Sequence, residues 1–149
     1  MSLNEPLIKE KIDRAVNVLL KNDLFLLMNN SDEWSISHKL AEYLQQEFPQ
    51  WHVDLEYNRD KDQAKKVEGK IVRPDIIVHL RNTDNNLLIV EIKKSNNLGD
   101  LEDYKERLKK FTSPEGRYRY KLGLLIVFYV GADFQKAPTI EFYKKGKQL

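Results

Sequence analysis

The chain contains no cysteine, so it can form neither disulfide bonds nor thiolate metal sites. Any bound metal must be held by oxygen or imidazole ligands, which points to hard cations. Long apolar runs are also missing, because segments such as 24–28 and 122–130 fall far short of the roughly 20 residues that span a bilayer. The first residues lack a basic start followed by an apolar stretch, so we expect no signal peptide and a cytoplasmic location.

A strong excess of charge of either sign is absent too. The chain has 25 Lys and Arg against 23 Asp and Glu, a net charge of +2, which by itself does not argue for nucleic-acid binding. Positive charge is nevertheless clustered at residues 105–110, 117–121 and 144–147. Such clusters suit a phosphate backbone, although solvated lysine-rich helix faces look the same in sequence.

The 149 residues, 41% of them hydrophobic, are enough for one compact domain. Apolar periodicity predicts amphipathic helices over residues 6–21, 32–48 and 101–112. Alternating or β-branched segments predict strands over residues 51–59, 71–80, 87–93, 122–130 and 137–144, the last at an edge. Residues 60–70 read as a charged loop. We therefore predict an α/β fold in which a mixed central sheet is flanked by helices.

Strand parity brings three ionisable residues together in the predicted hairpin formed by residues 71–80 and 87–93. If its turn centres near Thr83, residues whose numbers sum to about 166 lie opposite each other. Asp75 then faces Glu91, and Lys93 lies on the same face as Glu91 because side chains alternate along a strand. Two carboxylates and a lysine should therefore converge.

Burying these groups among Ile, Val and Leu is costly unless they neutralise one another or bind a cation. Mg²⁺ prefers oxygen ligands, takes one or two carboxylates and keeps positions for water and phosphate. Beside such water, Lys93 would orient it, help to deprotonate it or stabilise charge on the phosphate. The alternative is an internal salt bridge between Lys93 and Asp75 or Glu91, without chemistry.

The strings RPDIIVHL and LLIVEIKKS resemble the PD-(D/E)XK nuclease superfamily. Pro74 and Asp75 match the first part of its signature, and Glu91, Ile92 and Lys93 match the second. The resemblance covers about residues 31–130, a restriction-endonuclease-like core within a single domain of residues 1–149 that adds an N-terminal helix and a C-terminal extension. It implies an α/β/α sandwich and cleavage of phosphodiester bonds in DNA or RNA, and of the two we expect DNA. It also implies Mg²⁺ or Mn²⁺ as cofactor and the main-chain carbonyl of Ile92 as a metal ligand.

Many members of the superfamily place a glutamate on the helix before the sheet. Glu33, Glu42 and Glu47 are the candidates, and helical geometry chooses Glu33 because it lies near the buried stripe centred on Leu40. We therefore expect Glu33 as a further metal ligand. An acid in a first helical turn also stabilises the helix dipole, and this explains Glu33 equally well.

Further residues are candidates for substrate contacts. His79 shares the face of Asp75 and is either a substrate contact or a packed histidine. The basic candidates for phosphate contacts are Lys105, Lys109, Arg117 and Arg119. The partner implied is nucleic acid, with a two-fold homodimer as a further possibility.

Two other functions stay open. One is a catalytically inactive nuclease-like fold that binds nucleic acid or a protein. The other is an interaction module in which Asp75, Glu91 and Lys93 form a closed ion pair.

Overall fold

The computed structural model describes the chain except for residues 1–2, 56–58, 61–62, 65, 68–69 and 72, and the side chains within 56–72. A six-stranded mixed sheet lies at its centre, in the order β1-β6-β7-β8-β9-β10. Its strands are β1 (His52–Leu55), β6 (Ile76–His79), β7 (Asn86–Lys94), β8 (Leu122–Phe128), β9 (Thr139–Lys144) and β10 (Lys147–Gln148). The predicted α/β class with a mixed sheet and flanking helices is confirmed.

Three of the helices match the apolar periodicity closely, and the short helix over residues 24–28 was not predicted. The helices are α1 (Glu5–Asn22), α2 (Leu24–Met28), α3 (Glu33–Glu47) and α4 (Leu101–Thr112), with a short 3₁₀ turn, η1 (Gly131–Asp133). Side chains cap two of them, because Asn4 accepts a hydrogen bond from the backbone of Leu7 and Asp32 accepts one from Ser35. No helix in the described part of the chain is long and apolar enough to cross a membrane.

The central hairpin has the predicted register. Strands β6 and β7 are antiparallel, and Ile76 pairs with Val90 and Ile77 with Ile89, so that partner numbers sum to 166. The register shifts by one at His79, where the hairpin approaches its turn. Strand β8 runs parallel to β7, and α4 makes the crossover connection that a parallel pair requires.

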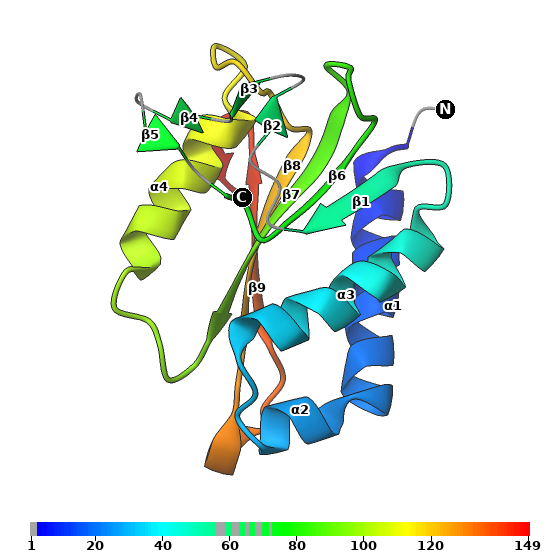
Figure 1. Cartoon of the computed structure of the whole chain (residues 1–149), viewed down its shortest axis with the longest axis vertical. Coiled ribbons are helices and arrows are strands. Elements are labelled where there is room, and N and C mark those ends of the chain that lie inside the picture. Colours follow the sequence, from blue (N-terminus) through cyan, green and yellow to red (C-terminus); the bar gives the residue numbers. More distant parts are fainter. Residues whose placement is uncertain (1–2, 56–58, 61–62, 65, 68–69, 72) are drawn as a thin grey trace.

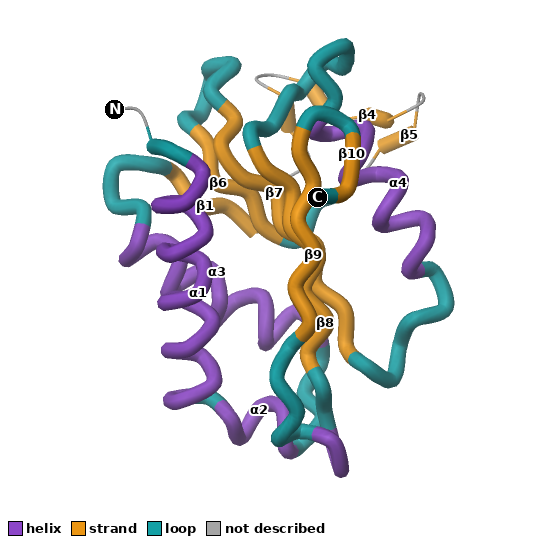
Figure 2. Tube along the Cα trace, turned by 180° about the vertical axis from the view of Figure 1, so that it is seen from behind, coloured by secondary structure: helices purple, strands orange, loops and turns teal. Residues whose placement is uncertain are grey.

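The sheet separates two unequal layers of helices. In Figure 1, α1 and α3 lie together on one side of the sheet and α4 lies alone on the other, and the reverse view in Figure 2 shows the same arrangement. The apolar core on the first side includes Ile12, Leu40 and Val90. The smaller core beneath α4 includes Ile89, Phe111 and Tyr120. Alternate residues of β7 therefore face different layers.

Two predictions of local structure are wrong. The segment 60–70 is not all loop, since it contains parts of two two-stranded sheets: β2 (Arg59–Asp60) with β3 (Gln63–Ala64), and β4 (Lys66–Val67) with β5 (Lys70–Ile71). The strand predicted over 71–80 is shorter, because Ile71 pairs with β4 and the central strand begins only at Ile76.

The strand predicted over 51–59 is seen as β1 alone, and residues 56–58 lie outside the described residues. The predicted segment 137–144 is found as β9, but the short β10 pairs with its end, so β9 is not the outermost strand there.

Candidate metal centre

Asp75 and Glu91 lie opposite each other where the central hairpin opens. Asp75 immediately precedes β6, and continuing the observed register by one pair places it across from Glu91. Its side chain turns onto the neighbouring strand, where Oδ2 accepts a hydrogen bond from the backbone N–H of Ile92 at 2.7 Å. This hydrogen bond fixes the Asp75 side chain against β7. Asp75 is half-buried, so part of it remains in contact with solvent.

Glu91 is almost completely buried, with 1% of its surface exposed. Its Oε2 accepts a hydrogen bond from Nη2 of Arg107 at 2.8 Å, whereas its Oε1 is buried and has no hydrogen-bond partner among the described residues. Burial raises the pKa of Glu91 to about 8, and the nearby charge of Asp75 adds to this rise against the opposing effect of Arg107. With this pKa the group is mostly protonated at pH 7, and a cation that bound the unpaired oxygen would displace the proton and stabilise the ionised form.

Lys93 is buried on the same side of β7, with 2% of its surface exposed. Its Nζ forms an ion pair with Oδ1 of Asp100 at 2.6 Å and lies 4.2 Å from the centre of the Tyr104 ring. Burial alone would lower the pKa of Lys93, but the hydrogen bond with Asp100 and the charges of Tyr104 and Glu33 outweigh it and raise that pKa. Lys93 is therefore held as a cation by Asp100, and it lies two residues after Glu91 on the same face of β7.

The donor set fits a hard divalent cation with few protein ligands. Within the described ranges, no group of three or more His, Cys, Asp or Glu side chains is close enough together to hold a metal ion. Mg²⁺ does not need such a group, since it is commonly bound by one or two carboxylates and keeps several waters. Asp75 and Glu91 supply two carboxylates, and the unpaired Oε1 of Glu91 is an atom that a cation would satisfy.

Glu33 is the first residue of α3, and its side chain reaches the C-terminal end of β7. Its Oε2 accepts a hydrogen bond from the backbone of Lys94 at 3.2 Å and a longer one from the side chain of Asn97 at 3.4 Å. Its charge is close enough to Lys93 to contribute to the raised pKa of that residue. Glu33 thus joins α3 to the end of β7, while its role as a further metal ligand stays a prediction.

His79 belongs to a separate cluster at the β1–β6 end of the sheet. It is 4% exposed, and its Nε2 lies 2.6 Å from Oδ2 of Asp54. Arg81 contacts the same carboxylate through Nε at 3.0 Å and Nη2 at 2.5 Å. Burial would raise the pKa of Asp54, but the hydrogen bonds from His79 and Arg81 prevail and hold it well below its usual range. His79 is thus packed against Asp54, and its role as a substrate contact stays a prediction.

The other predicted phosphate contacts lie outside the centre. Lys105 and Lys109 are on α4 but form ion pairs with glutamates, Lys105 with Glu141 at 3.5 Å and Lys109 with Glu106 at 3.1 Å. Arg117 and Arg119 are exposed in the segment between α4 and β8. Lys105 and Lys109 therefore lie on the helix that carries Arg107 but pair with other glutamates. Contacts of Arg117 and Arg119 with a phosphate stay predictions.

Sequence reasoning missed the groups that α4 adds. Arg107 and Asp100 are the charged partners of Glu91 and Lys93, and the Arg107 guanidinium lies 4.0 Å above the ring of Tyr104. One signal was available, because Arg107 falls three residues after Tyr104 and one before Leu108, on the apolar stripe of the helix. An arginine on a buried stripe requires an anionic partner.

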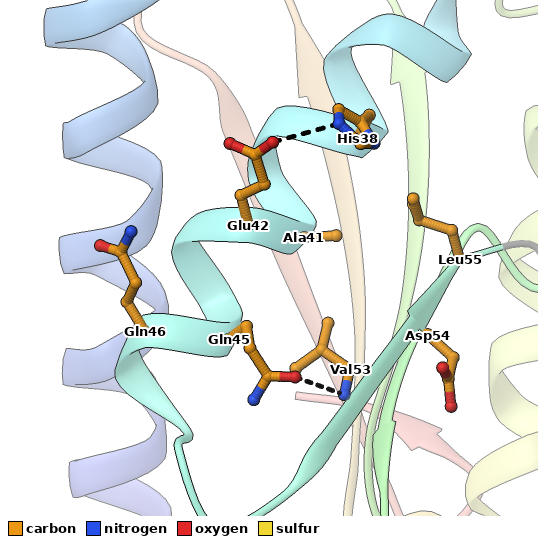
Figure 3. Close-up of a pocket in the computed structure, with 8 residues that line it drawn as sticks. All are labelled: His38, Ala41, Glu42, Gln45, Gln46, Val53, Asp54 and Leu55. Carbon is orange, nitrogen blue, oxygen red and sulfur yellow. Dashed lines mark hydrogen bonds and ion pairs between the residues drawn. The ribbon is translucent and has the colours of Figure 1, made fainter.

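A cavity of about 560 Å³ lies elsewhere, between α3 and the edge strand β1 (Figure 3). Its lining residues are His38, Ala41, Glu42, Gln45, Gln46, Val53, Asp54 and Leu55. None of the three residues predicted to carry the chemistry lines it. The cavity and the buried charges of β7 are therefore separate features of the fold.

Comparison with known proteins adds no assignment. No family model matches the chain, and no curated protein matches it either. The resemblance to the PD-(D/E)XK superfamily therefore depends on the signature residues and on their arrangement in the fold.

Proposed function

We propose that this protein is a divalent-metal-dependent nuclease that hydrolyses phosphodiester bonds in nucleic acid, with DNA as the expected substrate. The observation that carries the proposal is the buried, unpaired Oε1 of Glu91 close to Asp75, with Lys93 two residues further along the same face of β7. An acidic pair of this kind in an otherwise apolar sheet is explained by a cation. The cytoplasmic location and the two-fold homodimer stay predictions from the sequence.

In this proposal Asp75 and Glu91 hold Mg²⁺ or Mn²⁺ together with the main-chain carbonyl of Ile92. The bound metal would act as a Lewis acid toward the phosphate and lower the pKa of a bound water. Asp75 is oriented by its hydrogen bond to the backbone of Ile92, and Lys93 is kept charged by Asp100. Lys93 therefore orients the attacking water and stabilises negative charge that develops on the phosphate, instead of taking up a proton.

The proposal is tested by incubating the wild-type protein with double-stranded DNA, single-stranded DNA and RNA in the presence of Mg²⁺, Mn²⁺ or EDTA. Cleavage should require the metal and should fall by at least about 100-fold in Asp75→Asn and Lys93→Met, because each change removes charge from the centre. Circular dichroism checks that both variants fold. The proposal would be overturned if the wild type cut none of these substrates and bound neither Mg²⁺ nor Mn²⁺.

A binding module without catalysis is the second candidate, and one observation favours it. Arg107 already compensates part of the charge of Glu91 without a metal. Such a module should bind nucleic acid while showing no saturable Mn²⁺ binding, so calorimetric titration with Mn²⁺ separates the two functions.

A further inference from the structure

Two arginine–carboxylate pairs in this chain differ in how completely they are formed. Arg81 grips Asp54 with both Nε and Nη2, the closed side-on arrangement in which two parallel hydrogen bonds satisfy both carboxylate oxygens. Arg107 contacts Glu91 through Nη2 alone. Its Nε and the Oε1 of Glu91 are both buried and both lack a hydrogen-bond partner among the described residues.

Both partners of the half-formed pair are supported by neighbouring groups. The Arg107 guanidinium is supported by Tyr104, with its Cζ 4.0 Å from the ring centre, and Glu91 is fixed on a central strand. A closed pair would satisfy the two unpaired atoms, yet the contact stops at one hydrogen bond. The pair therefore leaves one oxygen of Glu91 for a second cation and one donor of Arg107 for a second anion.

A metal ion at Glu91 and the guanidinium of Arg107 would compete for the same carboxylate. Two cations that share one buried carboxylate repel each other strongly, because the surroundings screen charge less than water does. Arg107 should therefore weaken metal binding at Glu91. Once released, its Nε and Nη2 present the fork that matches two oxygens of a phosphate group.

We propose that Arg107 changes partners during the working cycle, compensating Glu91 before the metal binds and gripping a phosphate of the nucleic-acid substrate afterwards. This inference rests on the proposed nuclease function. The Arg107 side chain is 28% exposed although its Nε is buried, so the released side chain would turn outward to bring the guanidinium to a substrate phosphate. Arg107 thus sets both the affinity for the metal and the affinity for the substrate, in opposite directions.

The test measures Mn²⁺ binding by titration calorimetry on the full chain without substrate, for the wild type and for Arg107→Gln. Removal of the competing cation should tighten Mn²⁺ binding by about 3- to 10-fold. Lys39→Gln is the matched control, because it removes one positive charge from α3 on the other side of the sheet and should leave Mn²⁺ affinity unchanged. A merely structural role for Arg107 predicts weaker metal binding, the opposite sign.

The second readout is binding of a DNA duplex in Ca²⁺, measured by fluorescence anisotropy. Arg107→Gln should bind the duplex about 10-fold more weakly, since one charged phosphate contact is lost. Arg107→Lys keeps the charge but not the fork, so its Mn²⁺ affinity should stay close to that of the wild type. If Arg107→Gln does not fold, Arg107→Met carries the same test because its unbranched side chain still packs on Tyr104.

The outcomes separate this inference from the proposed function. Unchanged or weaker Mn²⁺ binding in a folded Arg107→Gln, with tight binding by the wild type, overturns the exchange and leaves the nuclease proposal standing. Equal tightening in Arg107→Lys and Arg107→Gln also overturns it, because charge would then not be the cause. Absence of Mn²⁺ binding by the wild type overturns both.

Discussion

The two faces of β7 have opposite character although their residues alternate along one strand. Leu88, Val90 and Ile92 enter the apolar core beneath α1 and α3. On the other face, Glu91 and Lys93 are just as buried but meet charged groups on α4 and at its N-terminal cap. The first face is built for stability, because it buries apolar surface without polar compensation. The second gives up part of that stability, and in our proposal its buried charges hold the metal and act on the phosphate.

Lys93→Met should produce the largest effect and should affect activity alone. Loss of the cation should lower the rate of metal-dependent cleavage by about 10²- to 10³-fold, the usual cost of removing a group that stabilises developing charge. The free energy of unfolding should change by less than about 1 kcal/mol, because a long apolar side chain replaces a buried ion and Asp100 is exposed enough to be solvated. Cleavage assays and urea denaturation provide the two measurements.

Lys94→Met is the control for the opposite face of the same strand. The Lys94 side chain is half-exposed and donates a hydrogen bond to Asn30 at 3.1 Å. Cleavage should continue at the wild-type rate. Equal loss of activity in both variants would contradict the assignment of chemistry to one face.

Leu40→Ala should show the reverse behaviour. Leu40 is completely buried in the core on the α1 and α3 side. Its truncation should lower the free energy of unfolding by about 2–5 kcal/mol, from lost burial and the cavity left behind. The cleavage rate per folded molecule should stay the same at a temperature where the variant is folded. A specific loss of catalysis without loss of stability would break the contrast between the two faces.

Asp54→Asn tests the closed ion-pair cluster and should have a smaller effect, about 2 kcal/mol of unfolding free energy, because charged hydrogen bonds to His79 and Arg81 are lost. Folding lowers the pKa of Asp54, so its ionised form stabilises the protein fully above the unfolded pKa of about 4. That contribution is lost as the pH falls toward the folded pKa. The difference between wild type and variant should therefore shrink between about pH 5 and about pH 2, as measured by urea denaturation at several pH values.

The positions of Asp75, Glu91 and Lys93 followed from the sequence because side-chain alternation and hairpin register obey a strict period of two. That regularity holds for Ile76 through Val78 and fails at His79, where the register shifts. Sequence pattern also placed α4 and its apolar stripe correctly. The periodicity of the sequence therefore predicts which side chains lie on the same face of a strand or helix.

Contacts between layers were not predictable in the same way. The pairing of Arg107 with Glu91 depends on the distance and angle at which α4 packs on the sheet, and no local pattern encodes either. The late start of β6 has a similar cause. The carboxylate of Asp75, rather than a backbone carbonyl, accepts the N–H of Ile92, so the ladder gives way to a side chain at that point.

The smallest effect is expected from Gly123→Ala, which tests how closely α4 approaches the sheet. A Cβ at Gly123 would lie 3.1 Å from Cγ2 of Thr112, 3.3 Å from Cδ2 of Leu108 and 3.3 Å from Cβ of Tyr143. These contacts are tight, so the substitution should cost about 1 kcal/mol of unfolding free energy, measured by urea denaturation. Gly99→Ala is the control, because an added Cβ there meets nothing within 4 Å.

Because α4 carries Arg107 above Glu91, the same substitution also connects packing to chemistry. An outward shift of α4 by a few tenths of an ångström would lengthen the single hydrogen bond that joins them, now 2.8 Å. Weaker competition from Arg107 should then tighten Mn²⁺ binding slightly in Gly123→Ala, by less than in Arg107→Gln. Weaker Mn²⁺ binding in Gly123→Ala would mean that α4 supports the metal ligands instead of competing with the metal. The proposed competition between Arg107 and the metal for Glu91 would then be wrong.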